Sequence, residues 1–273
     1  MNAKKWHNDF LIDLEQKTNS ESTLRNYGNC VYKFLNYFTY YREPKEIPTQ
    51  EIKRYLLKFE THNTRKQHLC AIRKFYDYTV NMPKKVTKIP YPKKQKKLPK
   101  VIDANYVNEV INGIENLKHK TMIAVAFECA LRRSEILNLK LSHIDRKRKL
   151  LLIENSKGNK DRYVPISDDL INLIIKYYRA YKPEVYLFNG NSKTDLRYSS
   201  SSYNNKIKDF FGKEFSTHTM RHSGTTAMHE AGVDISTLSK LLGHNSIKTT
   251  EIYTHVSLKT LQNIKSPLRL KSA

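Results

Sequence analysis

The first 82 residues carry apolar positions at helical spacing, separated by polar and charged ones. One apolar stripe begins after Ser22, a candidate N-cap, and a second follows Asn63. The first seventeen residues mix acids and bases among apolar positions, as an amphipathic helix does and a secretory signal does not. The stripes are Leu24, Tyr27, Val31, Phe34, Leu35 and Phe38, then Leu69, Ile72, Phe75, Tyr76 and Val80. We predict an all-helical N-terminal domain over residues 1–82, with these side chains in its core.

The segment from Pro83 to Lys100 interrupts the helical pattern. It holds eight lysines, four prolines and no acidic residue. Proline disfavours helix and central strand, and repulsion among the lysines favours an extended chain. We predict a basic linker over residues 83–100, with the domain boundary there.

Beyond the linker, a strand pattern appears between helical patterns. Asp103 is a candidate cap for a short helix, and a helical pattern over Thr121–Ala130 is expected to continue into a second helical stretch through LRRSEILNL. The LLLI run at 150–153, a Lys-Gly-Asn turn and a second strand ending at Pro165 predict a small antiparallel sheet. Helical spacing returns over Asp168–Tyr181. The predicted class is mainly α, with a mostly helical second domain over residues 101–273 that ends in a C-terminal tail.

Charge narrows the choice of partner. The chain has 49 Lys and Arg against 26 Asp and Glu, a net charge of +23, which favours a polyanion, above all nucleic acid. An anionic membrane surface competes, but no segment sets a cationic face opposite a wide apolar one, and no apolar run nears the roughly 20 residues of a membrane span. We expect a cytoplasmic, nucleoid-associated protein that binds double-stranded DNA.

Several basic residues are candidates for contact with DNA phosphates. Those in the N-terminal domain belong either to a solvated face or to a DNA-binding one, and the linker is a plain connector, a basic strap along DNA, or both. The candidates are Arg65, Lys66, Arg73, Lys74, Lys93, Lys94, Lys96 and Lys97.

The sequence predicts neither a metal nor a cofactor. Cys30, Cys70 and Cys129 are far apart, odd in number and embedded in apolar helical patterns, so we expect buried thiols rather than disulfides or a zinc cluster. No close acidic cluster resembles a two-metal nuclease site, and no P-loop pattern is present.

Four short motifs follow one another in the second domain. They are LRRSE at Leu131–Glu135, SKGNKDR at Ser156–Arg162, HTMRH at His218–His222 and LLGHNSIKTTEIYTH ending at His255. Each alone is common on exposed helices and turns. Together, in this order, they resemble the tyrosine recombinase (phage integrase) family, most closely its short Xer-like members. The resemblance covers Asp103–Val256, with a weaker architectural match before the linker.

The resemblance implies a role for individual residues. Tyr253 would be the nucleophile, Arg132 and Arg221 the catalytic arginines, and Glu135 the acid that supports Arg132. The hairpin lysine Lys157 would protonate the 5′ oxygen, His218 would assist proton transfer and His244 would bond the phosphate. One departure is Ala130, where the family usually has glycine, and this affects local helix packing.

The resemblance also implies an architecture. The N-terminal domain would be a SAM-like core-binding domain, and the two domains would clamp duplex DNA. Four protomers would exchange strands through a Holliday junction, with the tail docking between protomers. Strand cleavage would proceed through a 3′-phosphotyrosyl intermediate without metal or ATP.

These residue types suit phosphodiester cleavage on chemical grounds as well. A guanidinium stays charged and presents a planar fork to phosphate oxygens, and a tyrosine hydroxyl can form a covalent phosphate ester. A topoisomerase-like relaxer or a hairpin telomere resolvase would use the same chemistry, and a catalytically silent DNA-binding protein could keep the fold. The target DNA sequence and the biological role, from chromosome dimer resolution to transposition, stay open.

Overall fold

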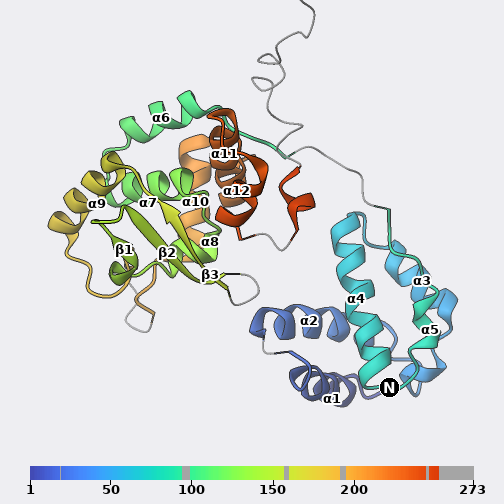
Figure 1. The fold of residues 1–273 in the computed structure, drawn as a ribbon. Helices are drawn as coiled ribbons and strands as arrows, with labels where there is room; N and C mark the ends of the chain where they lie inside the picture. The colour runs from blue at the N-terminus through green and yellow to red at the C-terminus, as the bar shows by residue number, and fades with distance from the viewer. Residues whose placement is uncertain (19, 94–98, 157–159, 191–194, 244–245, 252–273) are drawn as a thin grey trace, which may run out of the picture. The chain divides into compact units, whose positions relative to one another are not determined.

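The computed structural model describes residues 1–18, 20–93, 99–156, 160–190, 195–243 and 246–251. The chain divides into two compact units, Met1–Lys96 and Lys97–Ala273, each with its own hydrophobic core (Figure 1). The predicted class, mainly helical with a small antiparallel sheet, is confirmed. In the part of the chain that is described, no helix is both long and apolar enough to cross a bilayer.

The N-terminal unit is entirely helical. Its core is aromatic, and Phe34 and Phe75 meet with ring centroids 6.4 Å apart. Ser20, rather than Ser22, caps the second helix, because its hydroxyl accepts a hydrogen bond from the backbone N–H of Thr23. The helices are α1 (Ala3–Glu15), α2 (Glu21–Tyr37), the 3₁₀ turn η1 (Pro44–Glu46), α3 (Thr49–Leu57), α4 (His62–Tyr78) and α5 (Lys84–Thr87).

The expectation of an extended linker from Pro83 onward is wrong for its first residues. Lys84–Thr87 forms helix α5, and the side chains of Val86 and Ile89 are buried in the N-terminal core. Proline is compatible with the start of a helix, so Pro83 does not prevent one. The two apolar side chains, three residues apart, outweigh the repulsion among neighbouring lysines. Residues 94–98 lie outside the described residues.

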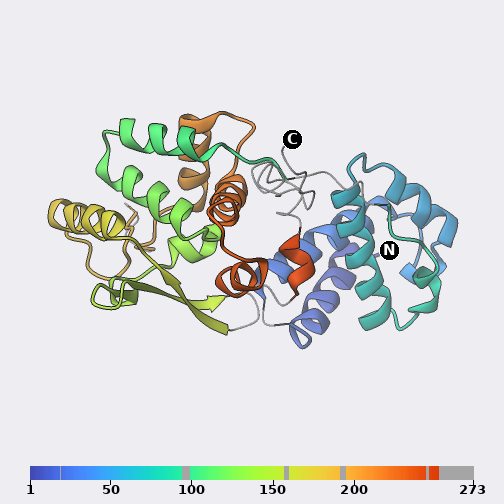
Figure 2. The same cartoon turned by 45° about the horizontal axis from the view of Figure 1, so that its top comes forward.

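The C-terminal unit packs helices against a three-stranded antiparallel sheet with strand order β1-β2-β3 (Figures 1 and 2). Leu151 pairs with Val164 and Ile153 with Arg162, which puts these four residues on the inner face of the sheet. Its elements are α6 (Ala104–Gly113), α7 (Leu117–Glu128), α8 (Arg133–Leu137), η2 (Leu141–His143), β1 (Ile144–Asp145), β2 (Leu150–Ser156), β3 (Lys160–Pro165), α9 (Asp168–Tyr181), α10 (Ser200–Phe211), α11 (Thr217–Glu230), α12 (Ile235–Leu241) and η3 (Ile247–Thr249).

Two predicted features of this unit are confirmed in detail. The Asp103 carboxylate accepts hydrogen bonds from the backbone N–H groups of Asn105 and Tyr106 and so caps α6. Helix α9 spans Asp168–Tyr181, as the spacing predicted. The helical pattern over Thr121–Ala130 and the second helical stretch through LRRSEILNL correspond to two helices, since α7 ends at Glu128 and α8 begins at Arg133.

A close contact between α11 and α7 positions the HTMRH motif. A Cβ atom on Gly224 would lie 2.1 Å from the carbonyl oxygen of Phe127, so only glycine allows the two helices to approach this closely. His218 and Arg221 lie on the first turns of α11. The contact therefore fixes how far these side chains stand from the end of α7.

Ala130 explains the break between α7 and α8. Its φ angle is +47°, in the left-handed region that favours glycine, and its side chain is fully buried beside Leu242 and Met228. The left-handed turn ends α7 and directs the Ala130 carbonyl toward α11. Glycine, which the resemblance led us to expect at this position, adopts such a backbone without strain.

Replacing Ala130 with glycine is expected to change the free energy of unfolding by less than about 1 kcal/mol. Relief of the left-handed strain, roughly 1–2 kcal/mol, offsets the loss of one buried methyl group, about 0.8 kcal/mol. The matched control is Ala126→Gly inside α7, also buried, where glycine lowers helix propensity as well and about 2 kcal/mol is lost. Urea denaturation of both variants tests this, and equal destabilisation would contradict the strain account.

Candidate active site

Arg132 stands immediately before α8, where its backbone serves as the N-cap. The Glu135 side chain accepts a hydrogen bond from the Arg132 backbone N–H at 2.8 Å and another from Arg132 Nη1 at 2.8 Å. The Arg132 side chain is 20% exposed, so its guanidinium is anchored on one side and still reaches solvent. This is the arrangement expected of a group that meets a phosphate from solution.

Arg221 is more deeply buried, with a side chain that is 6% exposed. Its Nη1 donates to the carbonyl of Ala130 and its Nη2 to the carbonyl of Leu242, each at 2.8 Å. Glu135 Oε2 lies 3.6 Å from Arg221 Nη1. The two carbonyls and the carboxylate together fix the plane of the guanidinium.

Arg162, the last residue of the SKGNKDR motif, also belongs to the site. The motif itself did not indicate a role for this residue. Its Nη1 and Nη2 donate to the two oxygens of Glu135 at 3.0 and 2.9 Å, as a two-pronged ion pair. A signal was present in the sequence, because Arg162 lies two residues before the buried Val164 on β3 and therefore faces inward. An inward-facing arginine requires a carboxylate partner.

Glu135 is thus shared by three guanidiniums. Burial by itself raises the pKa of Glu135, but the hydrogen bonds and charge of Arg162, together with the backbone and side-chain hydrogen bonds from Arg132, outweigh it and lower the pKa to about 2. The carboxylate is therefore ionised at neutral pH. With Arg221, these four groups carry a net charge of +2, which suits a phosphate that gains negative charge in its transition state.

His218 lies on the first turn of α11, within electrostatic reach of the arginines. Its side chain keeps contact with solvent, but the surrounding protein removes part of its hydration and so lowers its pKa below the ordinary 6.5. The positive charges of Arg133, Arg221 and Arg132 lower the pKa further. At neutral pH the ring is therefore uncharged and able to accept a proton.

The other predicted catalytic positions, Lys157, His244 and Tyr253, lie outside the described residues. The chain directly before His244 does reach the site, because Arg132 Nη2 donates to the Gly243 carbonyl at 3.4 Å and Arg221 contacts the Leu242 carbonyl. All four motifs therefore contribute a described residue to one place.

Two other tyrosines of the second domain are poorly suited to act as nucleophiles. Tyr203 is 1% exposed, and burial strongly raises the pKa of its hydroxyl. The Tyr198 hydroxyl is hydrogen-bonded to His119 Nε2 at 3.0 Å, and burial raises its pKa as well. A raised pKa disfavours the phenolate that attack on phosphorus requires.

The basic residues of the N-terminal unit differ in what they contact. Arg65 donates to the Phe59 carbonyl, and Arg73 donates to the carbonyls of Thr87 and Ile89 and lies over the Tyr91 ring. These two guanidiniums help to hold the unit together. The Lys74 ammonium bonds the Tyr78 hydroxyl.

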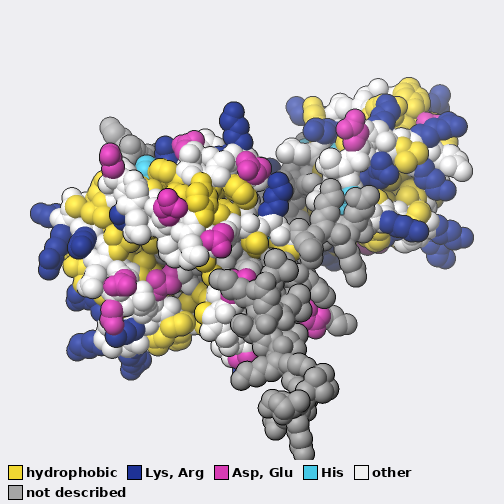
Figure 3. Space-filling model, turned by 90° about the horizontal axis from the view of Figure 1, so that it is seen from above, with side chains coloured by type: hydrophobic (Ala, Val, Ile, Leu, Met, Phe, Trp, Pro, Cys, Tyr) yellow, Lys and Arg dark blue, Asp and Glu magenta, His cyan; other side chains and the backbone are white. Residues whose placement is uncertain are grey.

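Lys66 and Lys93 are exposed, and Lys94, Lys96 and Lys97 lie outside the described residues. The face in Figure 3 shows Lys and Arg side chains spread over the N-terminal unit. Exposed ammonium groups of this kind are available to an anionic partner.

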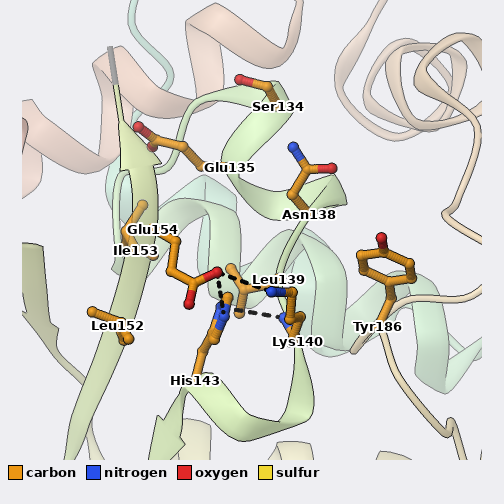
Figure 4. A pocket seen from close by; sticks show the side chains of 10 residues that line it. All are labelled: Ser134, Glu135, Asn138, Leu139, Lys140, His143, Leu152, Ile153, Glu154 and Tyr186. Carbon is orange, nitrogen blue, oxygen red and sulfur yellow. Dashed lines mark hydrogen bonds and ion pairs between the residues drawn. The ribbon is translucent and has the colours of Figure 1, made fainter. Parts of the chain in front are cut away.

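A second polar cluster lies at the base of α8, around a cavity of about 240 Å³ (Figure 4). Glu154 on β2 accepts a hydrogen bond from Lys140 Nζ at 3.0 Å and lies 3.2 Å from Nε2 of the buried His143. The Lys140 backbone N–H donates to His143 Nδ1. These contacts fasten η2, which follows α8, to strand β2 and so support the segment that carries Glu135.

Among the described residues, no group of three or more His, Cys, Asp or Glu side chains could hold a metal ion. Cys30 and Cys129 are buried free thiols, as expected, whereas Cys70 is partly exposed.

Comparison with known proteins adds independent information. Residues 100–259 match the phage integrase family, and residues 6–85 match the phage integrase N-terminal SAM-like domain. The tyrosine recombinase XerA of Pyrococcus horikoshii is 29% identical over 267 residues, which cover 93% of this chain and 90% of the relative. XerA of Saccharolobus solfataricus is 26% identical over 276 residues, covering 94% and 90%.

Solved structures show the same fold. XerH recombinase bound to its difH substrate superposes with a TM-score of 0.70 at 20% identity, covering 88% of this chain and 77% of that one. A lambda integrase tetramer bound to a Holliday junction gives 0.73 at 15% identity, covering 92% and 76%. Because the family match spans more than half of the sequence and takes in all the residues gathered around Glu135, this chain belongs to the phage integrase family, the tyrosine recombinases, and has Xer-like relatives.

Proposed function

We propose that this protein is a site-specific DNA recombinase that cleaves and rejoins double-stranded DNA through a 3′-phosphotyrosyl link to Tyr253. The observation that carries the proposal is the set of three guanidiniums arranged around Glu135. Relatives named as tyrosine recombinases, and solved relatives bound to a recombination site or a Holliday junction, support it.

The proposed chemistry begins with attack of the Tyr253 hydroxyl oxygen on the scissile phosphorus, while His218 assists removal of the phenolic proton. Arg132 and Arg221 bind the non-bridging oxygens, and His244 donates a further hydrogen bond to the phosphate. The bond to the 5′ oxygen breaks, and Lys157 gives that oxygen a proton. The phosphotyrosine ester keeps the energy of the original bond, so a second 5′ hydroxyl rejoins the strand by the reverse steps without ATP.

In this proposal the N-terminal unit binds DNA and the C-terminal unit carries out the chemistry. The N-terminal unit, with its SAM-like domain, binds the DNA core site, the basic residues up to 100 lie along phosphates, and residues 101–273 hold the chemistry. Within the N-terminal unit, Lys66 and Lys93 are the described candidates with exposed side chains, while Arg65, Arg73 and Lys74 also serve the fold.

Assembly and location complete the proposal. Four protomers assemble on two DNA sites in the cytoplasm, on chromosomal or plasmid DNA, and the tail from Ser257 to Ala273 docks on a neighbouring protomer. The tail lies outside the described residues, so the proposal for it comes from the near-helical spacing of Leu258, Leu261, Ile264 and Leu268.

A recombination assay tests the proposed function. Duplexes that the protein binds tightly are enriched from a pool with a randomised central region, and two copies are placed on one plasmid. The protein alone, without ATP or divalent metal, is expected to yield recombinant circles or trapped four-way junctions. Tight binding with unchanged plasmids and no covalent complex would favour the silent DNA-binding protein instead.

The rate of strand cleavage is expected to have an acidic limb set by His218. Because the pKa of His218 lies below its ordinary value of 6.5, the ring stays neutral at pH 7 and becomes protonated at lower pH. Cleavage of a nicked duplex in a single turnover should therefore be nearly constant from about pH 8 to 7 and fall only at lower pH.

His218→Gln should lower the rate and remove this acidic limb, whereas His222→Gln is expected to retain it. The pH profiles of the three proteins are compared on the same DNA. A limb centred above pH 6.5, or one that persists in His218→Gln, would contradict the role given to His218.

A further inference from the structure

Arg162 occupies an unusual position for an arginine. It lies on the inner face of the sheet, opposite Ile153, and its side chain is only 8% exposed. Removing a guanidinium from water costs several kcal/mol unless strong partners replace the hydration. A simple surface role is therefore excluded, and the contacts of Arg162 must account for its burial.

Those contacts join three separate segments. Two parallel hydrogen bonds connect Arg162 to both oxygens of Glu135 on α8. In addition, Arg162 Nε donates to the Leu241 carbonyl at the end of α12, at 2.6 Å. Strand β3 begins three residues after Lys157, and Leu241 stands three residues before His244. One side chain thus links strand β3, Glu135 and the segment that leads to His244.

The fork also determines where Glu135 can point. Each oxygen of Glu135 receives one hydrogen bond from Arg162, so the carboxylate cannot rotate without losing one of them. The same two oxygens face Arg132 Nη1 at 2.8 Å and Arg221 Nη1 at 3.6 Å. A rotation of the carboxylate would therefore misdirect both guanidiniums at once.

We infer that Arg162 is a positioning residue for strand cleavage: it locks Glu135 and, through Glu135, aims Arg132 and Arg221 at the scissile phosphate. The inference rests on the proposed recombinase function, which supplies the phosphate. Arg162 itself is too deeply buried, and too fully engaged with Glu135 and Leu241, to be assigned a phosphate contact.

The test uses the full-length protein and a nicked duplex enriched by its own binding. Arg162→Met keeps an unbranched side chain but removes the guanidinium and with it the fork. Because misplacement of a catalytic group by about 1 Å costs about 10²-fold, single-turnover cleavage is expected to slow by that order while the DNA dissociation constant stays within about twofold. Arg162→Lys restores the charge but not the fork and should remain strongly impaired.

A surface ion pair provides the matched control. Arg197 makes the same two-pronged contact with Asp195, with Nε and Nη2 each 2.8 Å from one carboxylate oxygen, but both side chains are partly exposed. Arg197→Met should cleave like the wild type. Wild-type cleavage by Arg162→Met or Arg162→Lys would overturn the positioning role.

A modified DNA substrate distinguishes a positioning role of Arg162 from a general contribution to folding. A methylphosphonate at the scissile position lacks one negative oxygen and needs less guanidinium stabilisation. The deficit of Arg162→Met relative to wild type is therefore expected to shrink at least about tenfold on this substrate. An equal deficit on phosphate and methylphosphonate DNA would mean that Arg162 acts on folding alone.

A spectroscopic readout keeps this inference independent of the proposed function. In the protein without DNA, the NMR signals of the Arg132 and Arg221 Nε–H groups should shift or broaden in Arg162→Met and stay unchanged in Arg197→Met. Unchanged signals would overturn the positioning role even if the wild type cleaves. Absence of cleavage by the wild type, with shifted signals, would contradict the recombinase function and leave the positioning of the arginines supported.

Discussion

Replacing Arg221 with lysine is expected to slow strand cleavage by about 10²–10³-fold, the usual effect of losing one preorganised donor to a developing oxyanion. An ammonium cannot donate to the carbonyls of Ala130 and Leu242 and also present a planar fork to a phosphate. Arg132→Lys should have a similar effect, because its contacts with Glu135 and Gly243 also depend on the planar group. Single-turnover cleavage of a nicked duplex measures both.

The control for these variants is Arg148→Lys. Arg148 is exposed, makes a 3.8 Å ion pair with Asp145 and belongs to none of the four motifs, so lysine there should leave cleavage unchanged. Thermal denaturation identifies any loss of folding in the buried Arg221 variant. Near-normal cleavage by both Arg132→Lys and Arg221→Lys would contradict the assignment of the two guanidiniums.

Replacing Tyr253 with phenylalanine is expected to abolish cleavage altogether while DNA binding survives. The change removes one hydroxyl and leaves the positive charge of the chain untouched, and contacts with phosphates supply much of the affinity. The variant should therefore bind with the affinity and steep salt dependence of the wild type. Gel-shift titrations at several salt concentrations, alongside cleavage of nicked DNA, measure the two properties separately.

Tyr198→Phe is the matched control for this prediction. Tyr198 belongs to the same domain, but its hydroxyl is hydrogen-bonded to His119, so cleavage should persist. Loss of DNA binding in Tyr253→Phe would show that Tyr253 serves the fold or the interface rather than the chemistry.

The sequence predicted the element types well because their signals are local. The apolar spacing predicted both ends of α9, and Asp103 was correctly predicted as the N-cap of α6. The second strand, predicted to end at Pro165, likewise corresponds to β3, which ends at that residue. In each case the residues that carry the signal lie within a few positions of one another.

The errors arose where distant contacts decide the local structure. Lysine-rich composition predicted an extended chain after Pro83, yet Val86 and Ile89 are buried in a core built by residues far earlier in the chain. The predicted helical pattern also included Ala130, which instead has a left-handed backbone and whose carbonyl accepts a hydrogen bond from Arg221, 91 positions later. Patterns of nearby residues do not contain such information.

In the candidate site, too, local motifs could be predicted from the sequence and contacts between distant residues could not. The motifs identified Arg132, Glu135 and Arg221, and the structure brings these three together. Arg162 was quoted within a motif but received no role, because its partner Glu135 lies 27 positions away. The placement of a buried ion pair depends on the pairing of β2 with β3 and on the approach of α8, which a single sequence does not specify.

The most direct test of the account is to locate the covalent bond between protein and DNA. Wild-type protein is incubated with its selected duplex carrying a nick beside the cleavage point, so that the short released strand diffuses away and rejoining fails. A denaturant-resistant adduct is expected, whose proteolytic peptide carries the nucleotide on Tyr253, joined through a 3′ phosphate. An adduct on any other residue, or tight binding of this DNA with no adduct at all, would overturn the proposed role of Tyr253.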